Sequence, residues 1–424
     1  MVYNLQKLLK YPPYYTVQKS LIMVHQGYWR NQSLTISVKP NCLTISLGSQ
    51  QVFSFDLAGR LWTALVNEVS YRRGLDGKVV AKWQTADKSR HRRWLSSEEA
   101  DNLIQRAHTI LNHLLQDLNS AQITLNPPLD AKGWQDLQTA ASFDISTAHA
   151  DALKYRQVYK PVGILPPDQY ISVVLQATEG CSFNTCTFCD FYRGRPFRIK
   201  REDEFREHVR AVKTYLSEGL SLRRTIFLGD ANALVVPMPR LVRLFEVVHE
   251  ELDVEKLGGI FAFLDGFSGE RKTAEDFALL ARLGLKRVYI GMESGHEPLL
   301  RFLRKPGTPE DVLQAVRNIK AGGVAVGIIV LLGAGGKKYA EAHVRETIQL
   351  INAMPLDLED LIYFSELIEN ENLPYVQSAY QSSLEPLSAE ERIRQGEQIE
   401  NALLFHPERG TPHISRYDIR EFIY

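Results

Sequence analysis

Short runs in which apolar and polar residues alternate open the chain. Residues 33–39 and 42–47 both alternate in this way, and Pro40-Asn41 lies between them, which predicts a β-hairpin. Residues 51–55 continue the alternation and are expected to add a third strand. The beginning of the chain is therefore expected to contain a small antiparallel sheet.

Helical patterns follow these strands. Residues 57–73 are expected to form one helix, and Ser96-Ser97-Glu98-Glu99 supplies the capping residues of a second that runs to about Leu118 on an apolar repeat of about 3.6 residues. We therefore expect residues 1–125 to form a small N-terminal α+β domain of unknown role. Residues 126–167 are polar and are expected to be an irregular connector.

The pattern changes from residue 171 onward, where short β-branched runs alternate with amphipathic helices. Strands are expected over 171–176, 225–228, 259–264, 286–292, 324–332 and 360–365, and helices over 202–217, 239–252, 273–283, 310–321 and 342–353. Strands that alternate with helices predict a parallel sheet covered by helices, and such a sheet curls into a barrel or part of one. The fold class is thus α/β, with a partial (β/α)6 TIM-like barrel over residues 168–370 and a helical C-terminal extension over residues 371–424.

The composition is that of an ordinary globular protein. The chain has 424 residues, no formal net charge, 44% apolar and 24% charged residues. The balanced charge gives no reason to expect bulk nucleic-acid binding. The apolar stretch at 324–332 is too short to span a membrane, and no signal peptide is evident. Four cysteines do not make a disulfide framework, so a reducing cytoplasm is expected.

Three of the four cysteines lie within nine residues. Cys181, Cys186 and Cys189 have the spacing C-x4-C-x2-C on the loop that follows the first strand of the expected barrel. A structural zinc site and an ordinary iron–sulfur cube both use four ligands, so three thiolates suggest a cubane cluster with one iron left open for a small molecule. The alternative is a Cys3His zinc site, but the nearest downstream histidine, His208, is expected on a solvated helix face. Cys42 alone cannot hold a second cluster.

The cysteine motif resembles that of the radical S-adenosylmethionine (SAM) superfamily. The commoner spacing there is C-x3-C-x2-C, and the longer first gap recurs in some subgroups. An aromatic residue before the last cysteine, here Phe188, is typical and usually flanks the SAM adenine. The resemblance covers residues 162–370 and does not include the N-terminal domain.

This resemblance implies both cofactors and a reaction. Cys181, Cys186 and Cys189 would hold three irons of one [4Fe-4S] cluster, and the amino and carboxylate groups of SAM would chelate the fourth. An electron supplied by a flavodoxin- or ferredoxin-type donor would break the C5′–S bond of SAM and release a 5′-deoxyadenosyl radical. That radical would take a hydrogen atom from the substrate. The protein would supply ligation, orientation and exclusion of water.

Polar residues follow the second and third strands of the expected barrel. Gly229-Asp230-Ala231-Asn232 stands where the family has a G-G-E motif that receives the methionine ammonium. Asn232 aligns with the acidic position, whereas Asp230 carries the negative charge, and both assignments stay open. The alternative is an ordinary turn, for which these residues are well suited. Asp265 follows the third strand and either faces the reaction or caps a turn.

Two further elements follow the fourth and fifth strands. Gly291-Met292-Glu293-Ser294-Gly295 resembles the "GxESG" element of coproporphyrinogen-dehydrogenase-like and elongator-catalytic-subunit-like radical SAM enzymes, in which the glutamate approaches the SAM ribose or methionine moiety. The alternative, a buried structural glutamate, is costly unless it is paired. Gly333 begins a glycine-rich turn that, in the family, lets the backbone approach the adenine. Its spacing does not fit a phosphate-binding loop.

Two basic segments lie outside these elements. Residues 192–200, after the cysteines, carry three arginines and a lysine that could bind an anionic substrate or an electron donor, although a solvated loop is the simpler interpretation. Residues 88–93 are also basic and could contact phosphate, but one short run is weak evidence for nucleic acid.

Three functions compete on this sequence. The first is a radical SAM enzyme that acts on an unidentified small molecule or on RNA; the second is an iron–sulfur and SAM-binding protein that delivers haem or a metal cofactor without turnover; the third is a zinc-stabilised barrel of other function. A cobalamin-dependent methyltransferase is not expected, because the D-x-H-x-x-G signature is absent. No residue selects the substrate, the reaction subclass, the electron donor or the oligomeric state.

Overall fold

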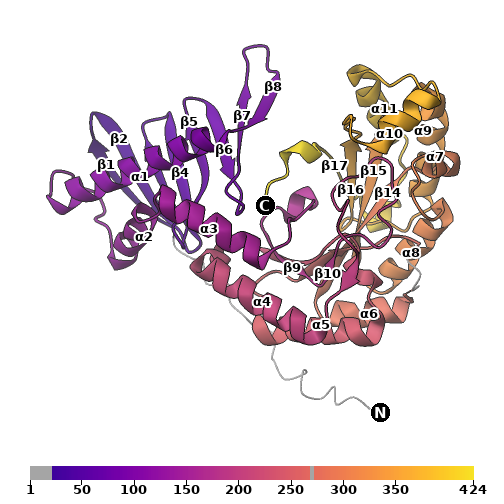
Figure 1. Cartoon of the computed structure of the whole chain (residues 1–424), viewed down its shortest axis with the longest axis horizontal. Coiled ribbons are helices and arrows are strands. Elements are labelled where there is room, and N and C mark those ends of the chain that lie inside the picture. Colours follow the sequence, from indigo (N-terminus) through magenta and orange to yellow (C-terminus); the bar gives the residue numbers. More distant parts are fainter. Residues whose placement is uncertain (1–21, 268–271) are drawn as a thin grey trace.

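The first part of the chain folds around one antiparallel sheet (Figure 1). The computed structural model describes residues 22–267 and 272–424, so the first 21 residues of the expected N-terminal domain lie outside the described part. Eight strands follow one another in sheet order: β1 (Met23–Trp29), β2 (Gln32–Val38), β3 (Cys42–Leu47), β4 (Gln51–Asp56), β5 (Leu61–Val66), β6 (Val69–Arg73), β7 (Val79–Gln84) and β8 (Arg90–Trp94). The three strands expected from the alternating pattern, β2, β3 and β4, are confirmed.

The helix expected over residues 57–73 is wrong, because this segment forms the hairpin β5–β6. Leucines recur every four residues from Leu57 to Leu65, which imitates a helical repeat. The turn decides the structure: Asn67 and Glu68 have positive φ angles of 49° and 67°, the backbone of a two-residue hairpin turn. The pairing of Val66 with Val69 closes the hairpin.

Three helices pack with this sheet. The expected helix after Ser96 is confirmed as α1 (Ser97–Asn119), with its capping box formed by Ser96 and Glu99. The segment expected to be an irregular connector instead contains α2 (Ala131–Ala141) and α3 (Ile145–Val158). Their start signals are Asp130 and Asp144, whose carboxylates accept hydrogen bonds from Gly133 N and Thr147 N. Polarity on the exposed faces of these short helices hid them in the sequence.

The second part of the chain is a seven-stranded parallel sheet with helices on its outer face (Figure 1). In spatial order the strands are β17 (His413–Tyr417), β16 (Leu361–Glu366), β15 (Ala325–Leu332), β14 (Leu285–Glu293), β13 (Ile260–Phe263), β12 (Thr225–Gly229) and β9 (Ser172–Gln176). Six of them are the expected strands. Within the described residues β9 and β17 form the two edges of the sheet, so it is an open, partial barrel.

The five expected barrel helices are confirmed, and further short elements connect them. The helices are α4 (Glu202–Leu216), α5 (Met238–Glu251), α6 (Ala274–Arg282), α7 (Glu297–Phe302), α8 (Pro309–Ala321), α9 (Gly336–Asn352), α10 (Pro374–Gln381) and α11 (Ala389–Asn401). Short 3-10 turns are η2 (Pro167–Gln169), η3 (Ser217–Leu222), η4 (Ala233–Val235), η5 (Pro407–Arg409) and η6 (Ile419–Glu421). The expectation of a purely helical C-terminal extension is wrong, because β17 returns from it to pair with β16.

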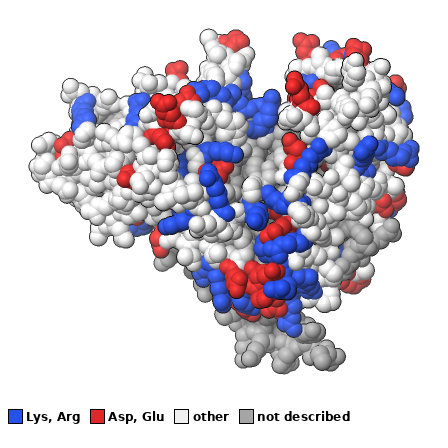
Figure 2. All heavy atoms as spheres, viewed as in Figure 1, with Lys and Arg blue, Asp and Glu red and all other residues white. Residues whose placement is uncertain are grey.

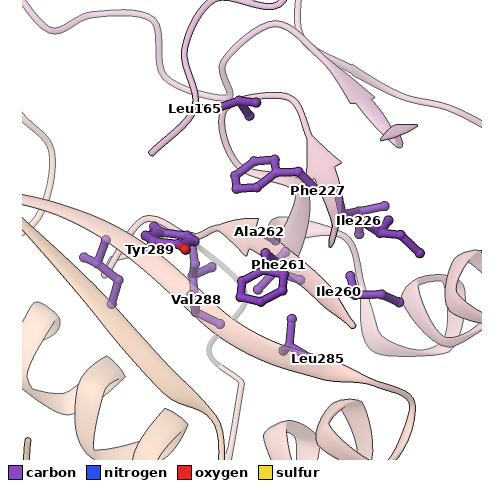
Figure 3. Close-up of a cluster of buried hydrophobic side chains, with 14 of the residues drawn as sticks. Leu165, Ile226, Phe227, Ile260, Phe261, Ala262, Leu285, Val288 and Tyr289 are labelled. Carbon is purple, nitrogen blue, oxygen red and sulfur yellow. The ribbon is translucent and has the colours of Figure 1, made fainter. Parts of the chain in front are cut away.

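Each sheet has its own apolar core. The larger core lies within the parallel sheet and beneath its helices, and Figure 3 shows part of it, where Phe227 of β12 and Tyr289 of β14 lie together with ring centroids 6.1 Å apart. The second core lies between the antiparallel sheet and α1, with Ile36, Phe53 and Leu111 buried there. Separate cores mean that each sheet buries its own apolar face.

A buried ionic network joins the two sheets. Arg60, at the start of β5, donates to Asp151 of α3 (2.9 Å) and to the backbone carbonyl of Tyr215 on α4 (2.6 Å). Asp56 pairs with the same guanidinium at 3.4 Å, and Arg73 lies 3.9 Å from Asp151. All of these side chains are less than 10% exposed. Because unpaired buried charges are costly, this network fixes α4 of the barrel against the antiparallel sheet.

Candidate active site at the carboxyl ends of the parallel strands

The cysteine loop is held from both sides. Two short strands, β10 (Thr178–Glu179) and β11 (Arg198–Ile199), pair at its base. Inside the loop, Thr187 N donates to the carbonyl of Leu303 (2.9 Å), and Tyr375 N donates to the carbonyl of Thr187 (3.0 Å). Arg193 Nε donates to the Cys189 carbonyl at 3.0 Å. These bonds fix the loop against α7 and α10.

All three cysteines of the motif line one cavity of about 370 Å³, which we call the central cavity. The cavity lies at the carboxyl ends of the parallel strands, where barrel active sites assemble. Phe188 also lines it and packs against an apolar cluster that includes Leu299, Leu303 and Leu331. Cys42 lies far along the chain on β3, buried in the antiparallel sheet.

The cysteine thiols are half-buried, and burial dominates their acidity. It raises the pKa of Cys186 to about 12 and that of Cys189 to about 11. Each charged thiolate would also disfavour ionisation of the neighbouring thiol, because Cys189 raises the pKa of Cys186 and Cys181 raises that of Cys189. The thiolates that a metal requires would therefore be stable here only beside bound cations.

The donor set fits a cluster better than a single ion. Within residues 22–267 and 272–424, no three His, Cys, Asp or Glu side chains converge closely enough to hold one metal ion. In a cubane cluster each thiolate binds a different iron, so the sulfurs stand farther apart than around zinc. His208, the alternative zinc ligand, does not line the cavity. It is buried rather than solvated, and its Nε2 accepts a hydrogen bond from Gln176 N at 2.9 Å.

Asp230 supports the cysteine loop instead of facing the cavity. It follows Gly229, the last residue of β12, and its carboxylate accepts hydrogen bonds from Gln176 Nε2 (2.8 Å), Gly180 N (3.1 Å) and Arg195 (3.0 Å). Burial raises the pKa of Asp230, and these donors oppose that rise. The carboxylate thus ties the entry of the cysteine loop to the end of β12.

Asn232 bridges two loops at the same edge of the sheet. Its amide nitrogen donates to Ser182 Oγ (3.1 Å) and to Asp265 Oδ2 (3.0 Å), and its amide oxygen accepts from Asp265 N (3.2 Å). Asn232 is fully buried and is not a lining residue, whereas Asp265 lines the cavity. Of these two residues, therefore, Asp265 is the one that a ligand in the cavity can contact. The remainder of that turn, residues 268–271, lies outside the described residues.

Glu293 enters the central cavity from a distorted strand end. The register of β14 against β15 shifts between Gly291 and Glu293, and Glu293 has a φ of 62°. A non-glycine residue in this left-handed region costs about 1–3 kcal/mol and is found mostly at functional sites. A bulge of this kind re-aims a side chain. Here it turns the carboxylate toward the cavity.

A buried lysine faces the two carboxylates. Lys305 Nζ lies 3.3 Å from Glu293 Oε1 and 3.8 Å from Asp265 Oδ1. Burial raises the pKa of each carboxyl and Lys305 opposes that rise, while the two carboxylates hold the pKa of Lys305 above its usual range against the effect of burial. A Cβ on Gly291 would stand 2.5 Å from Glu293 Oε1, so the glycine makes room for this ion pair.

Besides Gly229, Asp230 and Asn232, two further expected ligand-binding residues lie outside the cavity lining. Ser294 is buried, and its hydroxyl bonds to His343 Nδ1 (2.7 Å) and to the backbone N of His296 (3.0 Å). Gly333 donates its N–H to Gln395 Oε1 at 2.8 Å and has a φ of 83°. Both residues shape the turns beside the cavity, and neither is among the residues that line it.

Sequence reasoning missed Lys305 and the C-terminal residues Tyr417 and Arg420, all of which line the central cavity. The neighbours of Lys305 in the chain, Pro306 and Gly307, mark a loop and give no sign that the lysine is buried. Tyr417 and Arg420 reach the site only because β17 joins the sheet. No pattern in the sequence indicates that pairing.

Comparison with known proteins finds similarity in the domain around this cavity. A family model described as the Radical SAM superfamily matches residues 175–351. The heme chaperone HemW of Lactococcus lactis subsp. lactis (strain IL1403) is 23% identical over 181 residues, which is 40% of this chain and 44% of that protein. The chain thus matches less than half the length of this curated relative.

Two solved structures also align with the chain. The Escherichia coli coproporphyrinogen III oxidase HemN aligns with a TM-score of 0.40 and 13% identity, over 59% of this chain and 54% of that chain. Streptococcus suis SuiB bound to S-adenosylmethionine aligns with a TM-score of 0.40 and 12% identity, over 82% of this chain and 72% of that chain. Across the described residues, no helix has the length and apolar character needed to cross a membrane.

Proposed function

We propose that this protein is a radical SAM enzyme that binds a [4Fe-4S] cluster and cleaves SAM reductively, and the match of residues 175–351 to a model of the radical SAM superfamily supports this. One observation carries the proposal. Three thiols that belong to one loop and a buried lysine paired with two carboxylates line the same cavity at the carboxyl ends of the parallel strands. The cavity thus combines thiols, which are soft ligands for iron, with charged side chains that can bind the amino-acid end of SAM.

We assign the cluster to the cysteines. Cys181, Cys186 and Cys189 would each bind one iron, and Asp230 and Asn232 would position their loop through Gly180 and Ser182. A [4Fe-4S] cluster held there would supply, once reduced, the electron for cleavage of the C5′–S bond of SAM. The largely apolar wall of the cavity, which includes Phe188, would exclude water from that step.

Three other side chains would hold the two ends of SAM. Lys305 supplies a positive charge for the methionine carboxylate, and Asp265 supplies an acceptor for the ammonium. Glu293 can accept hydrogen bonds from the ribose hydroxyls or the methionine moiety. Gly229, Ser294 and Gly333 would act only by shaping the backbone of the surrounding turns. Phe188 would lie against the adenine.

The cluster assignment is tested by a matched pair of cysteine variants. Cys186→Ala should abolish cluster binding and SAM cleavage while the fold persists, whereas Cys42→Ala removes a cysteine that lies outside the cavity and should retain both. The measurements are iron and sulfide content after anaerobic reconstitution, visible absorption and circular dichroism. Retained cluster in Cys186→Ala refutes the ligand assignment, and zinc at full occupancy without absorption of an iron–sulfur cluster refutes the function.

The SAM assignment is tested at Glu293. Glu293→Gln keeps the size of the side chain but removes the charge, so we expect SAM affinity to fall by about tenfold, as for the loss of one charge-assisted hydrogen bond. Iron content should change little. Glu297→Gln, four residues along the chain on α7, is the matched control. Equal loss of iron and of SAM binding would make Glu293 structural.

A delivery protein is the second candidate, and the similarity to a heme chaperone favours it. Such a protein would bind haem or a metal cofactor at or near the cluster and pass it on without turnover. Substrate-dependent, multiple-turnover release of 5′-deoxyadenosine supports the enzyme. Stoichiometric haem binding with no such release supports delivery.

The proposed enzyme needs a supply of electrons. A flavodoxin- or ferredoxin-type donor would serve, and the exposed Arg193 beside the cysteine loop offers a positive charge for an acidic partner. All four cysteines are free, which supports a reducing compartment such as the cytoplasm.

A further inference from the structure

A second hollow adjoins the central cavity. It lies between the β7–β8 hairpin of the antiparallel sheet and β17 of the barrel, and its volume is about 920 Å³. We call it the cationic cleft. Glu366, Ile368, Tyr417 and Arg420 line both the cleft and the central cavity, so the two hollows are continuous.

The cleft differs from the rest of the molecule in charge. The whole chain has 50 Lys and Arg against 50 Asp and Glu, yet five arginines and only two acids line the cleft. The arginines are Arg90, Arg92, Arg93, Arg416 and Arg420. Lys and Arg also gather over the β7–β8 hairpin and along the hollow beside it in Figure 2.

The two acids of the cleft already have cationic partners. Asp418 lies 2.5 Å from Arg92 and also accepts two hydrogen bonds from Arg420, at 2.9 and 2.7 Å. Glu366 accepts from Arg392 at 2.9 Å. The Arg92–Asp418 pair joins β8 to the segment after β17 and so fixes the two walls. The cleft therefore has more guanidiniums than its two carboxylates can pair with.

Two exposed arginines supply that excess. Arg90 makes no side-chain hydrogen bond or ion pair within residues 22–267 and 272–424. Arg416 is exposed and uses one nitrogen to donate to the carbonyl of Ile393 at 3.2 Å, which leaves its other donors for a ligand. No lysine lines the cleft, and the planar guanidinium suits paired binding to carboxylate or phosphate.

Aromatic side chains complete the lining. Trp94 is 46% exposed at the end of β8, and Tyr170 and Tyr417 line the same hollow. Aromatic side chains that border a hollow next to guanidiniums suit a ligand that has a flat, unsaturated body and anionic groups on its edge.

On the premise of the proposed function, we propose that the cationic cleft binds the substrate and that this substrate is a small, flat molecule bearing carboxylate or phosphate groups. The central cavity of about 370 Å³ is at the low end of ligand pockets, about 300–1,000 Å³. On the proposed function, a cluster and SAM would fill it, which places the substrate in the adjoining hollow. Arg90 and Arg416 bind its anionic groups, and its reacting atom reaches the cavity past Tyr417.

A small ligand fits the cleft better than a nucleic acid does. Nucleic-acid surfaces spread their cations along an extended track, and the protein around them is basic as a whole. Here the guanidiniums are confined to one hollow, alternate with two carboxylates, and belong to a chain without net charge. The N-terminal sheet would then serve as one wall of the substrate site.

The test measures anion binding by the anaerobically reconstituted protein in isothermal titration calorimetry. Trimesate, a flat tricarboxylate, and pyrophosphate are the two probes, and the trimethyl ester of trimesate is the neutral control. The double variant Arg90→Gln/Arg416→Gln should raise the Kd of the preferred anion at least tenfold. The matched control Arg106→Gln/Arg282→Gln removes two exposed arginines that do not line the cleft and should change Kd less than twofold.

The outcomes separate the two proposals. Preference for trimesate identifies a carboxylate-bearing substrate, and preference for pyrophosphate identifies a phosphate-bearing one. No binding of either anion at millimolar concentration, or equal affinity in the two double variants, overturns the cleft assignment even if SAM still binds. Oligouridylate binding that strengthens with length and exceeds both anions also overturns it. Failure of SAM binding while anion binding persists rejects the proposed function instead.

Discussion

The central cavity and the cationic cleft both contain paired cationic and acidic side chains, but the pair in the cavity is buried and the pair in the cleft is exposed to solvent. In the cavity, Lys305 lies between Glu293 and Asp265, and no side chain of the three is more than 18% exposed. In the cleft, Arg93 makes two hydrogen bonds to Glu99, of 2.8 and 2.6 Å, but these side chains are 52% and 41% exposed. Geometry alone would rank the second pair as the stronger.

Burial reverses that ranking. Removing one partner of a buried pair leaves an unsolvated charge, whereas water replaces a lost partner at the surface. The charged side chains of the cavity therefore stay paired with each other unless a zwitterionic ligand, such as an amino acid, replaces both partners. In the cleft, the exposed guanidinium of Arg90 makes no side-chain hydrogen bond within the described part of the chain and that of Arg416 makes one, so both have donors for an anion of suitable shape. On the two proposals, the difference would let one protein hold a zwitterionic group inside and an acidic molecule outside.

The largest effect on stability is expected at Lys305. Lys305→Met leaves Glu293 and Asp265 buried without a cation, which should lower the free energy of unfolding by about 3–5 kcal/mol. Burial already raises the pKa of both carboxyls, and loss of Lys305 raises it further. Acids whose pKa is higher in the folded state stabilise the fold less as pH rises through that pKa, so the loss should be larger at about pH 8 than at about pH 5.

Urea unfolding of the variant and the wild type at these two pH values measures this effect. Lys305→Arg keeps the positive charge and is the control, for which a smaller and less pH-dependent loss is expected. An equal loss at both pH values would mean that the lysine acts through packing and not through charge.

Much of the barrel could be predicted because its signals are local. Each of the six expected strands has a continuous apolar run, and the cysteine spacing identifies its loop without reference to any distant residue. The hairpin at residues 61–73 was missed because leucines spaced four apart satisfy a helical repeat, while the turn that overrides it depends on the φ angles of Asn67 and Glu68.

The remaining parts of the site depend on contacts between distant segments. From the sequence, Lys305 is only a loop residue, and its role depends on its contact with Glu293 in the fold. Asp230 is likewise only a turn residue in the sequence, and its role depends on hydrogen bonds from Gly180 and Arg195. The strand β17 is short and polar, His413-Ile414-Ser415-Arg416-Tyr417, and only its pairing with β16 makes it a wall of the cleft. Neither propensity nor periodicity encodes such long-range contacts.

An effect that is smaller near neutral pH, and that grows in acid, is expected from a buried histidine beneath the cysteine loop. Burial lowers the pKa of His208 from 6.5 to about 3, and its neutral ring accepts from Gln176 N. A group whose pKa is lower in the folded state stabilises the fold above its unfolded pKa, and this stability is lost as pH falls below it. Wild-type protein should therefore lose up to about 1.4 kcal/mol per pH unit from this group between pH 6.5 and pH 3.

Replacing that ring with an amide should flatten this dependence. His208→Gln keeps an acceptor for Gln176 N but does not titrate, so its unfolding free energy should fall less steeply below pH 6.5. The exposed His413 provides the control His413→Gln, which should follow the wild-type curve. Parallel curves for wild type and His208→Gln would show that the histidine is protonated in the folded state.

The smallest effect is expected at the exposed pair of the cleft. The hydrogen bonds from Arg93 hold the pKa of Glu99 at about 2, so the pair contributes to stability above pH 4.5 and its contribution is lost as pH falls toward 2. Arg93→Gln should lower the melting temperature at neutral pH several-fold less than Lys305→Met does, and the difference from wild type should shrink in high salt, because surface charges are screened while buried ones are not. Melting curves at low and high ionic strength measure both. If the loss at Arg93 matched that at Lys305 and resisted salt, geometry rather than burial would govern the two sites, and the contrast between cavity and cleft would fail.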